Sequence, residues 1–394
     1  GNPERARNEI RAVCRAAFEG SGRFDTSLAE QEALADTLID SMLGFGPLES
    51  FLADESITEI MVNGSRSLFY ERDGMLHRSE FSFASDDEVR VLIDRIIGPL
   101  GRRIDESSPM VNARLAQGHR VNAIVPPLAL DGPMLTIRTF SSRVITLQDM
   151  VESGSIEEGV RRLLIWAVRA RKNIAVFGGT GSGKTTLLNA LSCHVPPDER
   201  IITIEDSAEL RFLEHPHVVR LEARPRNAEG VGEVTIRDLV ANALRMRPDR
   251  IIVGECRGGE ALDMLSAMNT GHEGSLTTLH ANSPKEAISR LVTMVRFVAD
   301  LPVDVIESQI ASAFDLIVQT ARGADGSRMV SQIAVISPGE SIRECIVAPI
   351  YERDICGGAG AWLSAPEWVG DLVKLGIATD KEVQSWKEML LCAS

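Results

Sequence analysis

The sequence predicts an α/β protein in which two α/β domains follow an N-terminal pair of helices. Residues 156–340 alternate short apolar runs with helical segments, which is the pattern of a largely parallel sheet covered by helices on both faces. Residues 51–140 hold shorter strand-like runs around one amphipathic helix, which predicts a small α/β domain. A glycine-rich loop ending in Lys-Thr stands between a strand-like run and a helix of the larger domain.

Residues 1–50 are expected to form an N-terminal helical bundle. Apolar residues at three- and four-residue spacing predict helices over 8–18 and 28–43. The cluster from Gly44 to Pro47 ends this region, because glycine and proline do not continue a helix.

The small domain, residues 51–140, is predicted from its turn and cap signals. Asn63-Gly64-Ser65 is a turn signal between two strand-like runs. Ser85 and Glu88 form a capping box in front of a helical apolar face. The strands expected here are 57–62, 67–70, 111–115, 120–125 and 135–140.

The larger domain is expected to follow a linker over residues 141–155. Ser155 and Glu158 form a second capping box at its first helix. Residues 341–394 are expected to be a partly helical C-terminal extension, with one or two amphipathic helices between 366 and 391. The strands expected in the larger domain are 174–177, 201–204, 218–221, 251–253, 275–278 and 316–319.

Composition and charge exclude several classes of protein. The 394 residues carry 42 Lys and Arg against 56 Asp and Glu, a net charge of −14, which disfavours binding to a long polyanion or an anionic lipid surface. The hydrophobic fraction of 44% and charged fraction of 25% are those of a folded chain. We expect no membrane span and no secretory signal. Six scattered cysteines without a C-x-x-C pair indicate a reducing, cytoplasmic setting and no structural zinc.

The strongest motif is a phosphate-binding loop. Residues 178–185 read GGTGSGKT and satisfy G-x-x-x-x-G-K-[ST], after a strand-like run and before a helix. Backbone N–H groups of such a loop converge on phosphates, Lys184 reaches the β- and γ-phosphates, and the Thr185 hydroxyl ligates Mg²⁺. The nucleotide-binding residues expected here are Gly178, Gly179, Thr180, Gly181, Ser182, Gly183, Lys184, Thr185 and Thr186.

Glu255 is the candidate general base. It directly follows the run Arg250 to Gly254, an apolar strand whose carboxyl end is where ligands of open α/β sheets bind. A carboxylate there can accept a proton from water attacking the γ-phosphate. By itself, a glutamate at a strand end is more often an ordinary surface residue.

Two further groups are candidates for metal or water positioning. Glu205, Asp206 and Glu209 follow a strand, although a solvated acidic turn has the same pattern. His280 stands at a strand end, where it can hydrogen-bond the γ-phosphate or its water. His272 follows a helix and is expected either to join this group or to cap that helix.

Arginines concentrate in the small domain. From Gly101 to Arg143 there are six arginines, three acids and no lysine, a net charge of +3 that leaves −17 for the rest of the chain. Arg114, Arg120 and Arg138 each stand within an expected strand. They are predicted to bind nucleotide phosphates, in their own or a neighbouring subunit, although a sheet face that pairs with acids or binds nucleic acid has the same pattern.

These motifs in this order carry a resemblance to a known family. GGTGSGKTT, TIEDSAEL and RPDRIIVGECRGGEALDMLSAMNTGHEGSLTTLHANSP resemble the secretion ATPase superfamily of hexameric motors. The segments ITEIMVNG, GRRIDESSPMVNARL and HRVNAIVPPLALDGPMLTIRTF are similar to its CpaF/TadA branch, which powers tight-adherence (Tad, Flp) pili. The resemblance covers residues 44 to 335, and the tetracysteine zinc insertion of the type II motors is absent from the sequence.

The resemblance implies a PAS-like first domain and a RecA-like second domain, with nucleotide between them in a homo-hexameric ring. It makes Lys184 and Thr185 the Walker A pair and Glu255 the Walker B glutamate. Glu205, Asp206 and Glu209 then fall in the Asp box, and His280, with His272, in the His box. The first-domain arginines match those that reach nucleotide.

The expected activity is therefore that of an ATP- and Mg²⁺-dependent motor. It assembles a Tad/Flp-type pilus through inner-membrane platform proteins, with retraction left open, and is held at that membrane by its partners. A related conjugation, type IV or type II secretion ATPase is the nearest alternative. A nucleic-acid translocase and a nucleotide-gated scaffold without turnover are alternatives of other classes.

Overall fold

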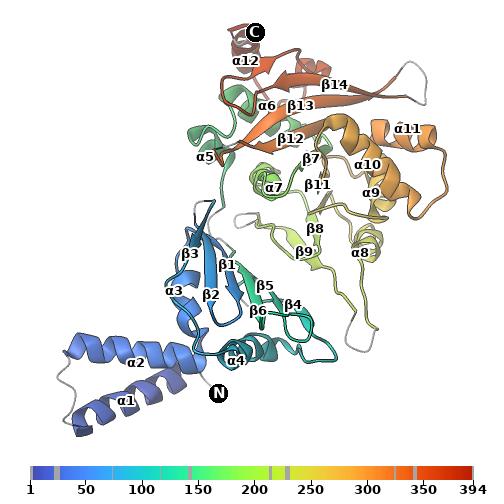
Figure 1. Cartoon of the computed structure of the whole chain (residues 1–394). Coiled ribbons are helices and arrows are strands. Elements are labelled where there is room, and N and C mark those ends of the chain that lie inside the picture. Colours follow the sequence, from blue (N-terminus) through green and yellow to red (C-terminus); the bar gives the residue numbers. More distant parts are fainter. Residues whose placement is uncertain are drawn as a thin grey trace. The chain divides into compact units, whose positions relative to one another are not determined.

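The computed structural model describes residues 3–21, 27–72, 74–115, 117–140, 144–212, 215–226, 231–323, 325–339 and 344–392. The chain divides into two compact units, residues 1–142 and 143–394 (Figure 1). Of the helices in these described parts, none combines the length and apolar character that crossing a bilayer requires.

Unit 1 begins with the predicted helices, α1 (Pro3–Ser21) and α2 (Leu28–Leu43). They run antiparallel, since Arg11 pairs with Asp36 while Arg15 lies 3.1 Å from Glu32. Two short turns of helix, η1 (Gly46–Leu48) and α3 (Glu49–Leu52), follow and lead into the first strand.

The rest of unit 1 is an antiparallel sheet of six strands in the order β3-β2-β1-β6-β5-β4. One face packs on α4 (Asp86–Ile97), where Val89 and Ile93 meet Ile60 and Val121 in a common core. The Ser85 hydroxyl caps α4 by accepting the Glu88 N–H, which confirms one half of the predicted capping box. The Glu88 carboxylate accepts the Ala84 N–H rather than that of Ser85. After η2 (Gly98–Leu100) the chain returns to the sheet. The strands are β1 (Ile57–Asn63), β2 (Ser67–Arg72), β3 (Met75–Arg78), β4 (Met110–Arg114), β5 (Arg120–Ile124) and β6 (Met134–Arg138).

Unit 2 is built on a sheet of nine strands in the order β15-β14-β13-β12-β7-β11-β10-β8-β9. From β12 to β9 every neighbouring pair is parallel, as predicted, and β13, β14 and β15 add antiparallel strands that the sequence did not reveal. Residues 341–394 therefore contribute β14 and β15 to this same sheet. The strands are β7 (Ile174–Gly178), β8 (Ile201–Glu205), β9 (Val218–Glu222), β10 (Arg250–Val253), β11 (Leu276–Leu279), β12 (Leu316–Arg322), β13 (Arg328–Pro338), β14 (Cys345–Glu352) and β15 (Ala361–Trp362).

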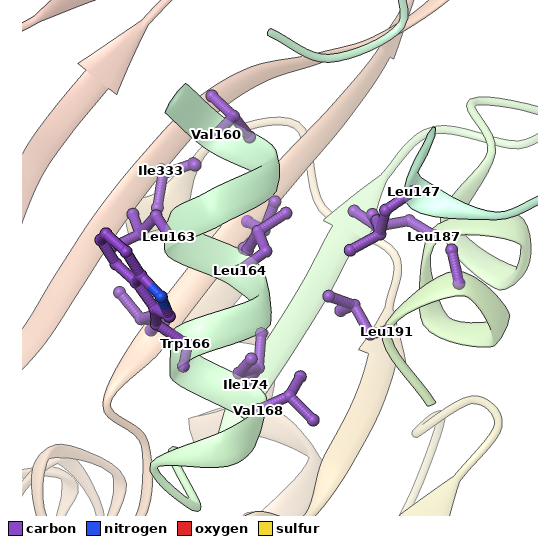
Figure 2. Close-up of a cluster of buried hydrophobic side chains, with 14 of the residues drawn as sticks. Leu147, Val160, Leu163, Leu164, Trp166, Val168, Ile174, Leu187, Leu191 and Ile333 are labelled. Atoms are coloured by element: carbon purple, nitrogen blue, oxygen red, sulfur yellow. The ribbon is translucent and has the colours of Figure 1, made fainter. Parts of the chain in front are cut away.

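Helices cover both faces of this sheet, which confirms the predicted α/β fold class. Ile174 and Val176 of β7 belong to one core, and the alternate residues Ala175 and Phe177 belong to the other. The first core contains α5 (Leu147–Glu152), α6 (Glu158–Arg169), α7 (Lys184–Ser192) and α12 (Asp380–Cys392), and Figure 2 shows its side chains around α6. The second contains α8 (Ile236–Ala243), α9 (Glu260–Asn269), α10 (Pro284–Arg296) and α11 (Val303–Ala313).

The C-terminal segment is anchored by tryptophan. After η3 (Glu367–Asp371), α12 places Trp386 against Trp166 of α6 and Trp362 of β15, with ring centroids 5.7 and 5.2 Å apart. The buried Trp386 indole donates a 2.8 Å hydrogen bond to the Gly159 carbonyl. The last helix is thus part of the first core.

The predicted capping box at Ser155 is wrong. Helix α6 begins at Glu158 with Glu157 as its N-cap residue and no side-chain cap. The Glu157 carboxylate instead accepts the Gly360 N–H, and the Glu158 carboxylate accepts from Arg161 and Arg162. Glu158, one of the two residues predicted to form the cap, instead pairs with arginines of its own helix, and Glu157 links the start of α6 to Gly360.

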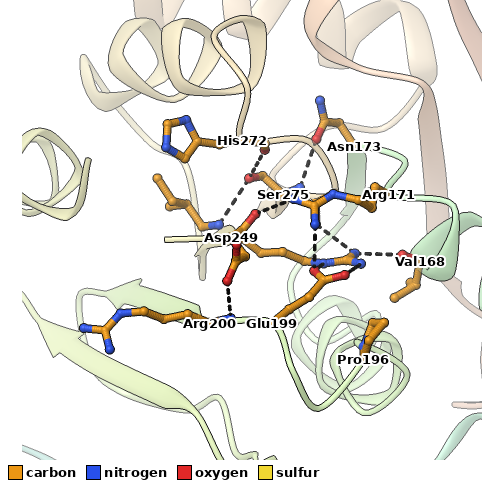
Figure 3. Close-up of polar contacts among 12 residues, drawn as sticks. Val168, Arg171, Asn173, Pro196, Glu199, Arg200, Asp249, His272 and Ser275 are labelled. Atoms are coloured by element: carbon orange, nitrogen blue, oxygen red, sulfur yellow. Dashed lines mark hydrogen bonds and ion pairs between the residues drawn. The ribbon is translucent and has the colours of Figure 1, made fainter. Parts of the chain in front are cut away.

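A buried polar network ties together the amino ends of four parallel strands (Figure 3). Arg250, at the start of β10, is fully buried and binds both carboxylate oxygens of Glu199, just before β8. Its Nη1 also donates to the carbonyls of Val168, in α6, and Gly274, just before β11. We call this network the amino-end clamp; its members are Arg171, Asn173, Glu199, Arg250 and Ser275.

The amino-end clamp extends to β7 through Asn173. The Asn173 amide oxygen accepts the Ser275 N–H, and the Ser275 hydroxyl in turn accepts the Ile251 N–H. Arg171 donates to the Asp249 carbonyl and lies 3.4 Å from Glu199. The amino ends of β7, β8, β10 and β11 are therefore held together by side-chain hydrogen bonds in addition to the backbone pairing of the strands.

Arg250→Met should strongly destabilise unit 2. The change leaves the largely buried Glu199 carboxylate with less positive charge beside it and removes the donor to two carbonyls, a loss of about 3–5 kcal/mol. All four tryptophans lie in unit 2, so their fluorescence in a urea titration reports on it. Arg245→Ala is the control, since that guanidinium is exposed and donates to the Ala241 carbonyl one turn earlier in the chain. Equal urea midpoints for the two variants would contradict the clamp.

Candidate nucleotide site

The phosphate loop joins the carboxyl end of β7 to the amino end of α7. Gly178, Gly181 and Gly183 have φ angles of +155°, +71° and +98°, which residues with a Cβ rarely adopt. A Cβ on Gly178 would lie 2.2 Å from the Thr320 carbonyl oxygen of β12. The glycines are therefore required both by backbone conformation and by close packing.

Lys184 begins α7 and is almost entirely buried. Its ammonium donates to the carbonyls of Gly178 and Gly179 at 3.1 and 2.9 Å. Thr185 and Thr186 follow in the first turn of α7, where helix N–H groups have no partner within the helix. Gly179 and Thr180 are exposed on the loop. This geometry suits an anion that approaches the helix from the loop side.

Glu255 and His280 come together because they follow adjacent parallel strands, β10 and β11. The Glu255 Oε1 atom lies 2.8 Å from His280 Nε2, and its Oε2 atom is bonded by Arg257. Arg257 also lies 3.6 Å from Asp206. Both carboxylate oxygens of Glu255 therefore face nitrogen groups.

The electrostatic surroundings of His280 link this pair to the phosphate loop. Partial burial lowers the pKa of His280, and the positive charge of Lys184 lowers it further, while Glu255 opposes the shift. The imidazole is thus favoured in its neutral form near Lys184 and Glu255. These three residues form one cluster at the carboxyl edge of the sheet.

The three acids after β8 divide into different environments. Glu205 is buried, and its Oε1 atom accepts the N–H groups of Glu209 and Leu210 at 2.8 and 3.0 Å. Burial raises the pKa of Glu205 to about 7. Asp206 is exposed and faces Arg257, and the charge of Glu209 acts on both Glu205 and Arg257. Glu205 thus holds the acidic loop, and the other two acids lie toward Arg257.

His272 lies apart from His280, before β11 rather than after it. The His272 Nδ1 atom is 3.2 Å from the Ala267 carbonyl of α9, and its backbone N–H bonds the same carbonyl. Its own carbonyl accepts the Ser275 hydroxyl of the amino-end clamp. Of the two expected roles, helix capping is the one this geometry shows.

The three arginines of unit 1 form one row across neighbouring strands. Arg114 pairs in register with Arg120, and Arg120 with Arg138. On the far side of Arg138 the row continues with Glu59 of β1 and Glu71 of β2. Residues that pair in register share a sheet face, so three guanidinium groups are gathered beside two carboxylates. Arg143, also counted among the arginines, lies outside the described residues.

Three residues that touch this site were not found from the sequence. Arg257 is two residues after Glu255 in the chain and bonds its carboxylate. The order Glu-Cys-Arg in the sequence could have indicated this ion pair. Thr320 and Arg328 contact the phosphate loop from β12 and β13. They lie more than a hundred residues from that loop, so no local pattern could connect them to it.

The comparisons with known proteins point to one family. A model described as type II/IV secretion system protein matches residues 41–335. A putative conjugal transfer protein of Mycobacterium tuberculosis (strain ATCC 25618 / H37Rv) is 38% identical over 342 residues, covering 85% of this chain and 97% of that protein. The conjugal transfer protein TrbB of Rhizobium radiobacter is 36% identical over 284 residues, covering 71% and 83%.

A solved structure is also similar to this chain. The X-ray structure of the Legionella pneumophila ATPase DotB superimposes with a TM-score of 0.53 and 25% identity. The match covers 75% of this chain and 80% of that one. The similarity therefore extends over most of both chains.

Glu205→Gln should remove a pH-dependent part of the stability of unit 2. Between the ordinary pKa of 4.5 and about 7, the unfolded carboxyl ionises while the folded one stays protonated. Folding stability from this group therefore falls as pH rises through that window, by about 3 kcal/mol in total. Urea titrations from pH 4.5 to 8 should show this decline in the wild type and its absence in Glu205→Gln. Parallel pH profiles for the two proteins would contradict the assignment.

The exposed Glu222 of β9 supplies the control for this experiment. It pairs in register with Glu205 on the neighbouring strand. The Glu222 carboxylate accepts the Ala208 N–H at 3.2 Å, a bond that the amide oxygen of glutamine can keep. Glu222→Gln therefore changes the same functional group without changing a buried carboxyl, and its profile should follow that of the wild type.

Proposed function

This chain belongs to the type II/IV secretion system protein family, and we propose that it is an ATP-hydrolysing motor of such a system. The observation that carries the proposal is the cluster of Lys184, Glu255 and His280 at one edge of a parallel sheet, beside a complete phosphate loop. The Legionella relative, itself named an ATPase, supports the same activity.

The phosphate loop has the features that a nucleotide site needs. Left-handed glycines at 181 and 183 let consecutive backbone N–H groups face one anion, and the amino end of α7 adds its positive dipole. Lys184 is the cation for the β- and γ-phosphates. The Thr185 hydroxyl is a hard oxygen donor of the kind Mg²⁺ prefers, and that ion supplies charge neutralisation on the phosphates.

Glu255 is the proposed general base. A water in line with the γ-phosphate loses its proton to the Glu255 carboxylate as the phosphorus–oxygen bond to the leaving ADP breaks. The Nε2 atom of His280 lies 2.8 Å from Oε1 of that carboxylate. Arg257 holds Oε2 and links it to Asp206, which with Glu209 completes the acidic side of the site.

The motor is proposed to act as a homo-hexamer whose two α/β domains close on ATP and reopen after hydrolysis. In this arrangement the row of Arg114, Arg120 and Arg138 supplies positive charge to nucleotide phosphates, from the same or a neighbouring subunit. The ring works from the cytoplasmic side on inner-membrane platform proteins. Its membrane association comes from those partners.

Two kinds of system are candidates for the process that this motor drives. A Tad/Flp-type pilus is proposed from the first-domain segments that resemble that branch. Conjugal transfer, a related secretion process, is favoured by the names of the Mycobacterium tuberculosis and Rhizobium radiobacter relatives. Neighbouring genes separate the two: prepilin and prepilin peptidase genes indicate a pilus, and coupling-protein genes indicate conjugation.

A nucleic-acid translocase is the alternative of another class. It draws on the arginine row, and the net charge of −14 opposes it. The secretion motor predicts that double-stranded DNA leaves the ATPase rate unchanged and that DNA binding is undetectable at 150 mM salt. Salt-dependent DNA binding with a stimulated rate would replace the motor by the translocase.

Glu255→Gln should retain ATP binding and lose hydrolysis by about 10²–10⁴-fold, since an amide cannot take the water's proton. Lys184→Ala should lose affinity for ATP itself, because the phosphates lose their buried cation. Steady-state phosphate release and equilibrium ATP binding measure the two effects. Glu222→Gln, which changes an exposed glutamate at the end of β9, is the matched control. Undiminished turnover in Glu255→Gln would exclude this residue as the base.

A further inference from the structure

The hairpin of β12 and β13 runs along the phosphate loop. Strand β12 is the parallel neighbour of β7, and Thr320 pairs in register with Gly178, the first residue of the loop. The approach is close enough that a Cβ on Gly178 would meet both the carbonyl and the hydroxyl of Thr320, at 2.2 and 2.7 Å. The Ser182 hydroxyl lies at the same point, 2.6 Å from that Cβ position.

Thr320 reaches the middle of the loop through a pair of hydroxyl groups. Its Oγ1 atom lies 2.7 Å from Oγ of Ser182, and both side chains are buried. The Ser182 hydroxyl donates to the Gly179 carbonyl at 2.9 Å. The Thr320 Oγ1 atom also lies 3.3 Å from the Phe177 carbonyl oxygen, so either hydroxyl can donate to the other. The two hydroxyl groups thus connect β12 to the Gly179 carbonyl through Ser182.

Arg328 holds the far side of the loop. It is the first residue of β13, and its Nε atom donates to the Gly181 carbonyl at 2.9 Å. Its Cδ atom lies 3.5 Å from the position that a Cβ on Gly183 would occupy. The guanidinium of Arg322, opposite Arg328 in the hairpin, lies 3.8 Å from the corresponding position on Gly181. The hairpin thus contacts the two left-handed glycines of the loop.

We propose that Thr320 and Arg328 are positioning residues that brace the phosphate loop in its nucleotide-binding conformation. They hold the carbonyls of Gly179 and Gly181, through Ser182 in one case and directly in the other. A peptide unit whose carbonyl is held cannot rotate, so its N–H groups keep their direction toward the phosphates. The proposal rests on the proposed function, because it concerns affinity for the same nucleotide.

The brace lowers the entropic cost of binding and takes no part in the chemical step. Ordering a flexible loop on binding reduces affinity, and a loop already held in place avoids that loss. Loss of the brace should therefore weaken nucleotide binding while leaving turnover at saturating ATP almost unchanged. A residue that acts in the transition state would instead lower kcat.

The test uses ADP, which occupies the phosphate loop without needing Glu255. Calorimetric titration of the full chain with ADP should give a Kd about tenfold higher in Arg328→Ala and in Thr320→Val than in the wild type. Steady-state hydrolysis should show a matching rise in KM for ATP, with kcat within about twofold. Tryptophan fluorescence in urea checks that each variant is folded.

Conservative variants show whether the hydrogen bond to the loop or the positive charge of the arginine is responsible for the effect. In Arg328→Gln the amide nitrogen stands where Nε stood, so the bond to Gly181 is kept while the charge is lost. Thr320→Ser keeps the hydroxyl. Both should bind ADP within about twofold of the wild type, and failure of Arg328→Gln to restore affinity would overturn the positioning role. Arg245→Ala is the matched control, because its exposed guanidinium also bonds a backbone carbonyl.

The outcomes distinguish this inference from the proposed function. If wild-type protein binds ADP and Arg328→Ala binds it as tightly as Arg245→Ala does, the brace is refuted and the motor assignment stands. A fall in kcat at unchanged Kd also refutes it. If the wild type binds neither ADP nor ATP, the proposed function itself fails.

Discussion

The buried guanidinium of Arg250 is the interaction that ties together the sheet on which the candidate nucleotide site is built. It joins the starts of β8, β10 and β11, and Asn173 and Ser275 extend the connection to β7. Parallel strands fixed at their amino ends also have a fixed register at their carboxyl ends. Those carboxyl ends carry the phosphate loop, Glu205, Glu255 and His280. The amino-end clamp thus adds side-chain bonds to the pairing of the strands whose carboxyl ends carry the candidate site.

Charge balance determines the chemistry at that edge. Lys184 and Arg257 supply positive charge, Glu255 and Asp206 supply negative charge, and burial beside Lys184 favours neutral His280. Glu205 is removed from this balance because burial and two backbone N–H groups turn it into a structural residue.

The sequence predicted the parts of the site that depend on local pattern. The phosphate loop, the strand before Glu255 and the Ser85 cap rest on residues adjacent in the chain, and all three have the predicted backbone. It could not predict that Glu205 turns inward, since burial of one carboxylate among three depends on the packing of Gly254 against it. Thr320 and Arg328 were missed for a related reason: their role arises only from strand order. Strands β13, β14 and β15 were missed because their antiparallel pairs lack the helical crossovers that mark parallel strands.

A structure of the chain with Mg²⁺ and a non-hydrolysable ATP analogue tests the central claim most directly. That claim is that the carboxyl ends of β7, β10 and β11 form one ATP-hydrolysing site. We expect the β-phosphate to lie within the loop of residues 178–183. We also expect the Glu255 carboxylate to lie within hydrogen-bonding reach, about 3 Å, of a water in line with the γ-phosphate. A nucleotide bound elsewhere, or a γ-phosphate that Glu255 cannot reach through one water, would contradict the claim.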